Sequence, residues 1–286
     1  MLVMSLDKIS VFGLGFVGGT TANCMHELGT NVYGVDIDKR KFDKMHKGIN
    51  CTTDYKLAIK ETDVSFVCVE TPCKDNGDIN MKPLEAVCGQ IGEALKEKRF
   101  ARNHTVVIRS TFFPNKVKGL IDILENESGK KVNEDFGFAI NPEFLREAYS
   151  YEDFLNPPFI VVGSNTKDTA RIVFNCYNKI NVPKIHVSTD IAQIIKYVNN
   201  SWHALKVAYT NEIGRVCKEY EINGNEVMDL FRKDTKLNIS EKYHKIGEPY
   251  GGHCLPKDLS VLTHHISEEK CPIIHSISKS NKITND

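Results

Sequence analysis

The chain has 286 residues, 41% of them hydrophobic, which is enough for two ordinary domains with well-filled cores. Lysine plus arginine and aspartate plus glutamate number 37 each, which excludes a global field that recruits nucleic acid or an anionic membrane. No apolar run approaches the roughly 18 to 20 residues that span a bilayer, and the N-terminal stretch does not read as a signal peptide. Nine scattered cysteines without a CxxC pair favour reduced thiols in a cytoplasmic protein over disulfides or a zinc site.

The first part of the chain predicts a β-α-β unit. A β-branched run at 8–13 is followed by a helical pattern at 17–28 and by a second strand, 31–36, that ends in an acid. Further strands are expected at 64–69, 104–109, 136–140 and 159–162, and further helices at 39–47, 83–97 and 114–124. Because strands alternate with helices, the sequence indicates an α/β fold with a doubly wound parallel sheet of the Rossmann type, closing at 159–162.

The second part of the chain changes to a helical pattern. The stretch 190–220 predicts one unusually long helix, with Thr189 or Asp190 as its N-cap. Shorter helices are expected at 167–180, 224–233 and 257–267. We therefore predict a Rossmann-like domain over 1–165 and an all-helical domain, with the long helix at its centre, over 166–286.

The motif GLGFVG lies between the first strand and the first helix, where it suits a dinucleotide. Gly13 permits the tight turn, Gly15 lets the backbone approach a pyrophosphate, and Gly18 lets the helix pack closely on the strand. Asp36 ends the second strand, where a carboxylate binds a ribose 2′-hydroxyl and favours NAD over NADP. The predicted cofactor site also includes Phe16, Val17 and Lys41. The alternatives are a glycine turn in an unrelated α/β protein and a solvated Lys41.

One cysteine has a setting that suits a reactive thiol. Cys254 follows two glycines and precedes Leu-Pro-Lys-Asp in the stretch 250–258. A helix that begins near Pro256 would lower the pKa of this thiol through its dipole. The local sequence leaves a catalytic and a structural cysteine equally open.

Polar residues share one face of the predicted long helix. They are Lys196, Asn200, His203 and Asn211, at spacings of four, three and eight. A lysine in a cleft binds an anion or stabilises a developing oxyanion, whereas the alternative is a solvated stripe.

Taken together, these segments resemble the UDP-glucose/GDP-mannose dehydrogenase family. The matching stretches, in family order, are GLGFVG, ETP (70–72), RST (109–111), NPEFLRE (141–147), IIKYVNNSWHALK (194–206), NEIG (211–214) and GGHCLPKD (251–258). The GDP-mannose branch is favoured by NGDIN (76–80), SGKK (128–131), Trp202-His203 and KLNIS (236–240).

The resemblance implies an NAD-dependent four-electron oxidation of the C6 hydroxymethyl of a nucleotide sugar, with Cys254 forming a thiohemiacetal and then a thioester. It implies that Lys196 and Asn200 stabilise the C6 oxyanion, and that Glu147 activates water with Glu143 nearby. Thr111 and Asp258 would hold the water and the lysine, and Thr71 and Thr111 would line the NAD site. Substrate contacts are implied for Glu147, Lys196, Asn200, His203, Asn211, Tyr243, Lys245 and Gly251.

The resemblance also implies the partners. The substrate would be GDP-mannose or UDP-glucose, and a homodimer would form through the long helix. The protein would act in the cytoplasm, in polysaccharide biosynthesis. No metal, nucleic acid or membrane partner is expected.

The sequence departs from the family at several points. The stretch 45–54 runs straight across a segment that carries a Pro-Gly-Leu signature in relatives, and Glu70 replaces the usual Gly or Pro before Thr-Pro. We expect the family's C-terminal nucleotide-sugar-binding domain to be absent after KSNKITND, with weak binding of the sugar donor as a consequence. These departures leave open an inactive NAD-binding remnant. A dehydrogenase of the 6-phosphogluconate or 3-hydroxyacid type is disfavoured, because that group lacks the cysteine loop at 250–258.

Overall fold

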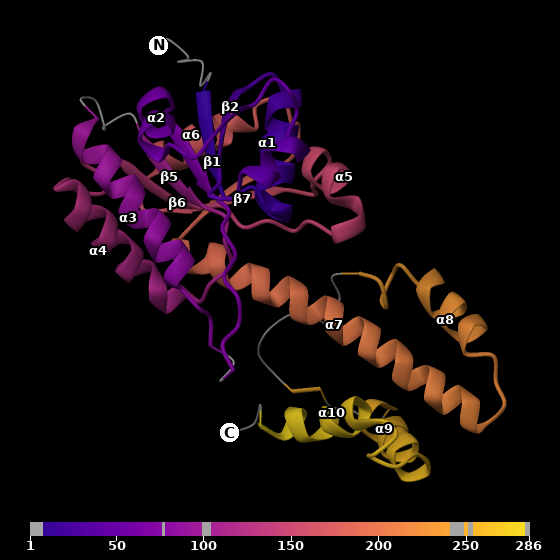
Figure 1. Ribbon diagram of the computed structural model, residues 1–286. Helices are drawn as coiled ribbons and strands as arrows, with labels where there is room; N and C mark the ends of the chain where they lie inside the picture. Colours follow the sequence, from indigo (N-terminus) through magenta and orange to yellow (C-terminus); the bar gives the residue numbers. More distant parts are fainter. Residues whose placement is uncertain (1–7, 76–77, 99–103, 241–248, 251–253, 284–286) are drawn as a thin grey trace. The chain divides into compact units, whose positions relative to one another are not determined.

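A computed structural model describes residues 8–75, 78–98, 104–240, 249–250 and 254–283 (Figure 1). The chain divides into two compact units, Met1–Asn199 and Asn200–Asp286. The strands are β1 (Lys8–Phe12), β2 (Asn31–Val35), β3 (Asn50–Thr52), β4 (Val64–Val67), β5 (Thr105–Ile108), β6 (Gly137–Ile140), β7 (Ile160–Ser164) and β8 (Lys184–Val187). The helices of the first unit are α1 (Phe16–Glu27), α2 (Tyr55–Glu61), α3 (Lys82–Glu97), α4 (Val117–Ser128), α5 (Ser150–Leu155) and α6 (Lys167–Cys176), with 3-10 turns η1 (Lys39–Lys44), η3 (Pro114–Lys116) and η4 (Glu147–Tyr149).

The first unit is built on one sheet of eight strands, in the order β3-β2-β1-β4-β5-β6-β7-β8. All neighbouring strands are parallel except β6 and β7, which are antiparallel. Phe12, the last residue of β1, lies opposite both Val35 of β2 and Val67 of β4. The chain therefore leaves these three central strands at the same edge of the sheet, and the strand order reverses between β1 and β4. The predicted doubly wound α/β fold is confirmed.

Helices cover both faces of this sheet, as Figure 1 shows. One apolar core joins the strands to α2, α3 and α4, and a second core joins the opposite face to α1, α5 and α6. The strands β4 and β5 are buried along their whole length, which matches their continuous apolar sequences. The two helix layers hold the sheet in place, so that residues at the strand ends have fixed positions.

Several local predictions were wrong. The sheet does not close at 159–162, because β8 adds an eighth strand; its sequence is only four residues long and mostly exposed, so it carries no apolar run. The helix predicted at 39–47 is present as a 3-10 helix, whereas β3 and α2 follow it where no element was predicted. The boundary near residue 165 stays a prediction; the compact units divide after Asn199.

The second unit contains helices in its described residues. The long helix α7 (Thr189–Glu219) begins in the first unit and continues into the second, followed by α8 (Gly224–Lys233), α9 (Cys254–His265) and α10 (Pro272–Ile283). Glu212 of α7 is 1% exposed, and its carboxylate accepts hydrogen bonds from the amides of Ile273 and Ile274 at 2.7 and 3.0 Å. A buried carboxylate thus caps the first turn of α10. Over the part of the chain that the structure describes, none of the helices has the length and apolarity needed to cross a membrane.

Candidate active site

The glycine turn after β1 brings backbone against backbone. Gly13 has φ +85°, in the left-handed region that favours glycine. A Cβ on Gly18 would stand 1.7 Å from the carbonyl oxygen of Gly13, so any side chain there would push α1 away from the strand. The N-terminus of α1 is therefore held close to the turn, with its free amides directed to the carboxyl edge of the sheet. This cradle fits the pyrophosphate of a dinucleotide.

Asp36 directly follows β2 at the same edge. Its side chain is 4% exposed, and its Oδ2 accepts hydrogen bonds from the amide of Leu14 at 2.7 Å and from Lys41 Nζ at 3.1 Å. Its Oδ1 accepts from the amide of Asp38 at 2.9 Å. A carboxylate offers about four lone-pair positions, so Asp36 can still accept a hydrogen bond from a ribose hydroxyl. Three of the predicted cofactor residues thus lie close together. Asp36 contacts Lys41 directly, and it also contacts Leu14, which follows Gly13 in the turn.

The segments after β4 and β5 lie side by side. The hydroxyl of Thr71 donates to the carbonyl oxygen of Thr111 at 2.6 Å, and the hydroxyl of Ser110 donates to that of Val69 at 2.7 Å. Both threonines are partly buried. The two predicted threonines are therefore neighbours, on the side of β1 away from Asp36.

A buried ion pair lies beyond β6. Lys196 Nζ donates to Glu143 Oε1 at 2.7 Å, and each side chain is only 10% exposed. The other oxygen of Glu143 accepts from the amide of Leu145 at 2.7 Å, and Lys196 Nζ lies 5.9 Å from the centre of the Phe144 ring. Residues 53 positions apart in the chain, both predicted to be catalytic, are thus in direct contact.

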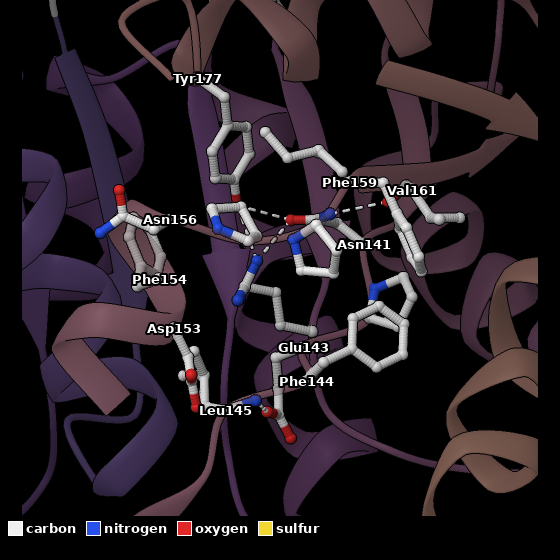
Figure 2. Close-up of a pocket in the computed structure, with 15 residues that line it drawn as sticks. Asn141, Glu143, Phe144, Leu145, Asp153, Phe154, Asn156, Phe159, Val161 and Tyr177 are labelled. Carbon is white, nitrogen blue, oxygen red and sulfur yellow. Dashed lines mark hydrogen bonds between the residues drawn. The ribbon is translucent and has the colours of Figure 1, made fainter. Parts of the chain in front are cut away.

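Sequence reasoning missed a buried hydrogen-bond network that begins two residues before Glu143, at Asn141. Arg109 is 5% exposed and its Nη1 donates to Asn141 Oδ1 at 2.5 Å and to the hydroxyl of Tyr177 at 2.7 Å. Figure 2 shows Asn141 linked to Tyr177 on one side and to Val161 on the other. Burial raises the pKa of Tyr177, so its hydroxyl stays neutral and donates to Asn141. Arg109 is the first residue of the motif RST, and Asn141 is the first residue of the motif NPE, so both motifs pointed to these positions. No motif in the sequence pointed to Tyr177.

The cavity drawn in Figure 2 lies under the NPE segment. It has a volume of about 90 Å³ and is lined by residues that include Arg109, Asn141 and Glu143. Pockets that hold cofactors and drug-sized ligands are roughly 300 to 1,000 Å³. The cavity is therefore too small for NAD or a nucleotide sugar. Arg109 lines it, and the buried Nε of this side chain has no hydrogen-bond partner.

The remaining predicted residues are not brought together by contacts in the described parts. Glu147 is exposed on η4, and Asn200, His203 and Asn211 are exposed on α7. Tyr243, Lys245 and Gly251 lie outside the described residues. Cys254 is the first residue of α9, so this helix begins two residues before Pro256, close to the predicted start; the side chains of Cys254 and Asp258 lie outside the described residues.

The other cysteines are mostly shielded. Burial raises the pKa of Cys24, Cys68, Cys88 and Cys176 to about 12, so these thiols stay protonated near neutral pH. Cys73 is exposed. Among the described residues, no group of three or more His, Cys, Asp or Glu is arranged to hold a metal ion.

The fold and the site define the class. A strand-order reversal between β1 and β4, a glycine turn at the start of α1 and an acid at the end of β2 make a dinucleotide-binding site. A buried lysine, Lys196 of α7, adds a positively charged group close to that edge, where it contacts Glu143 just after β6. This is the arrangement of a dinucleotide-dependent dehydrogenase.

Comparison with known proteins gives the family. Residues 7–51 and 47–181 match the NAD-binding domain of the UDP-glucose/GDP-mannose dehydrogenase family, and residues 190–283 match its central domain. The chain belongs to this family, and NAD is its cofactor. The two matched segments overlap at 47–51, inside the stretch 45–54 where the sequence departs from its relatives.

Two relatives and two solved structures show how far the similarity extends. The GDP-mannose 6-dehydrogenase of Pseudomonas aeruginosa is 40% identical over 96% of this chain and 68% of its own length. The UDP-glucose 6-dehydrogenase of Haloferax volcanii is 31% identical over 89% and 64%. A ternary complex of GDP-mannose dehydrogenase from P. aeruginosa matches with a TM-score of 0.92, at 40% identity over 96% of this chain and 68% of that one. A UDP-glucose dehydrogenase from Pyrobaculum islandicum matches with a TM-score of 0.76, at 27% identity over 100% and 69%.

Asp36 allows a direct test of cofactor choice. We expect the protein to bind NAD at least tenfold more tightly than NADP. Asp36→Ala should weaken NAD binding by roughly tenfold or more, because a hydrogen bond to a charged acceptor is worth about 1.5–3 kcal/mol. The same change removes the ion-pair partner of Lys41, so the difference between the affinities for NAD and NADP should become smaller. Calorimetry on both cofactors measures these affinities.

Asp38→Ala is the matched control, since Asp38 is two residues away and pairs with Arg40. Its affinity for NAD should stay within about twofold of the unmutated protein. Equal binding of NAD and NADP by the unmutated protein would contradict the role given to Asp36.

Proposed function

We propose that this protein oxidises the C6 hydroxymethyl group of a nucleotide sugar to a carboxylate, with GDP-mannose as the favoured substrate. The contact between Lys196 and Glu143 carries the proposal, because it holds a buried ammonium group in one position. Further support comes from the 40% identity to GDP-mannose 6-dehydrogenases over 96% of the chain. The glycine turn from Gly13 to Gly18 and Asp36 would hold NAD, which would supply the hydride acceptor for two oxidations at C6.

The chain's own residues supply the remaining chemistry. Lys196 and Asn200 stabilise the negative charge that develops on the C6 oxygen as its proton leaves. The thiolate of Cys254 adds to the aldehyde carbon to give a thiohemiacetal, and loss of the second hydride turns this into a thioester. Glu147 removes a proton from water, which attacks the thioester carbon and releases the carboxylate and the thiol. Covalent capture keeps the aldehyde bound between the two oxidations.

The structure supports a specific part for Glu143. Its carboxylate contacts Lys196 at 2.7 Å and is fixed by the amide of Leu145 at 2.7 Å. A buried carboxylate in contact with the ammonium group fixes the direction in which the lysine points, so we assign Glu143 to positioning Lys196. Thr111 and Asp258 are assigned to hold the attacking water and the lysine. Tyr243, Lys245, Gly251, His203 and Asn211 are assigned to substrate binding.

We also propose a cytoplasmic homodimer that acts in polysaccharide biosynthesis. Large apolar side chains are exposed along α7, namely Ile191, Ile194, Val198, Trp202, Leu205 and Val207, at fractions from 39% to 63%. Most of them recur every three to four residues, which places these along one side of the helix.

Light scattering should report a mass of two chains for the protein, and Leu205→Glu should shift the measured mass toward that of one chain. A monomer at micromolar concentration would contradict the dimer.

The activity is tested by the release of NADH. Incubation with NAD and either GDP-mannose or UDP-glucose should release two NADH for each sugar oxidised. The absorbance of NADH measures this release over time. Cys254→Ser should lower acid formation by more than roughly a thousandfold, because the covalent step is lost. Its affinity for NAD should be unchanged, since the thiol acts after the cofactor binds. NAD binding without NADH release from any nucleotide sugar would favour the inactive remnant.

Thiol labelling tests Cys254 separately from turnover. Iodoacetamide should modify Cys254 faster than every other cysteine, because a thiol at the first residue of a helix is activated by the helix dipole. The buried cysteines, with pKa values near 12, should react slowest. Peptide mass spectrometry over time measures the order.

The exposed Cys73 is the reference thiol, and Cys73→Ser removes its signal without touching Cys254. If Cys73 is labelled as fast as Cys254, or faster, the activation of Cys254 is refuted.

A further inference from the structure

Glu70 follows β4 and reaches the glycine turn. Its Oε1 lies 3.8 Å from the position that a Cβ on Gly15 would occupy. Gly15 precedes α1, and its carbonyl oxygen accepts from the amide of Gly19 at 2.7 Å. The carboxylate of Glu70 therefore lies close to the backbone of the residue that precedes α1, on the side where a side chain of Gly15 would stand.

The sheet fixes which part of the cofactor lies nearby. A dinucleotide crosses an open α/β sheet where the strand order reverses, here between β1 and β4. Asp36 marks the adenosine side at the end of β2, so the end of β4 faces the pyrophosphate and the nicotinamide half. Glu70 lies at that end.

Glu70 differs from Asp36 and Glu143 in having no counter-ion. Asp36 pairs with Lys41 at 3.1 Å, and Glu143 pairs with Lys196 at 2.7 Å. Glu70 is exposed, and within the described ranges it forms no ion pair and no hydrogen bond. The first turn of α1 holds no acidic residue of its own. The negative charge of Glu70 is therefore not neutralised before the cofactor binds.

We propose that Glu70 is a specificity-determining residue that disfavours NADH relative to NAD. Both forms carry the negative pyrophosphate, which the carboxylate repels. The oxidised form also carries a positive pyridinium ring, which the carboxylate attracts, whereas the reduced form has lost that charge. Repulsion is therefore stronger for NADH. This consequence deepens the proposed function, on which it rests: a reaction that forms two NADH at one site needs the reduced cofactor to leave twice.

The test compares binding of NAD and NADH to the unmutated protein and to Glu70→Gln, a change that removes the charge and keeps the size. Calorimetry should show NADH bound about three- to tenfold more tightly by the variant, the range expected for unit charges a few ångströms apart in a largely aqueous setting. The gain for NAD should be smaller. Both differences should shrink at high ionic strength.

Asp75→Asn is the matched control, because it removes the same charge from an exposed position five residues further on. It should change neither affinity by more than about twofold. Unchanged affinities in Glu70→Gln would overturn the proposal, and so would weaker binding of both forms, which would show that the carboxylate binds a cofactor hydroxyl. Because the readout is binding, a failure to oxidise any nucleotide sugar while the Glu70→Gln shift persists would contradict the proposed function alone.

Discussion

The contact between Gly18 and the carbonyl of Gly13 controls the carboxyl edge of the sheet. Only the missing side chain lets α1 start within reach of β1, since a Cβ there would lie 1.7 Å from the carbonyl oxygen. This close start brings the amide of Leu14 to Asp36 at 2.7 Å and brings Gly15 to the carboxylate of Glu70. The position of the adenosine side of the cofactor site and the position of its midpoint therefore both depend on the close approach of Gly18 to the carbonyl of Gly13.

The ion pair of Lys196 and Glu143 differs in kind from the ion pairs at the surface. Exposed pairs such as Lys118 and Asp122 contribute about 0–1 kcal/mol to stability. Removing one partner of a buried pair leaves an uncompensated charge and costs about 3–5 kcal/mol. A change at Glu143 therefore disturbs folding and the position of the lysine together. Glutamine at this position keeps the volume, so its effect reports the lost charge alone, whereas alanine adds the cost of a cavity.

Motifs and their order were enough to predict the α/β fold, and they led to the glycine turn and to Asp36, which the structure joins at one edge of the sheet. They could not predict the contact between Lys196 and Glu143, because it depends on how the segment after β6 meets the start of α7. Nor could they predict Tyr177, which looks like an ordinary core aromatic until its hydroxyl is seen to contact Arg109. Strand β8 escaped because a short, exposed edge strand has no apolar periodicity to read.

The pairing of charges at this edge explains why one unpaired group has a large influence. Asp36 with Lys41, and Glu143 with Lys196, are each neutral at a distance, and the field of such a pair falls off faster than that of a single charge. The chain as a whole has no net formal charge, so no overall excess of one sign adds to the potential at this edge. Glu70 lies within a few ångströms of the turn, well inside the screening length of about 10 Å at 0.1 M salt. The local potential that an incoming pyrophosphate meets is therefore set by the amides of α1, which attract it, and by the carboxylate of Glu70, which opposes them.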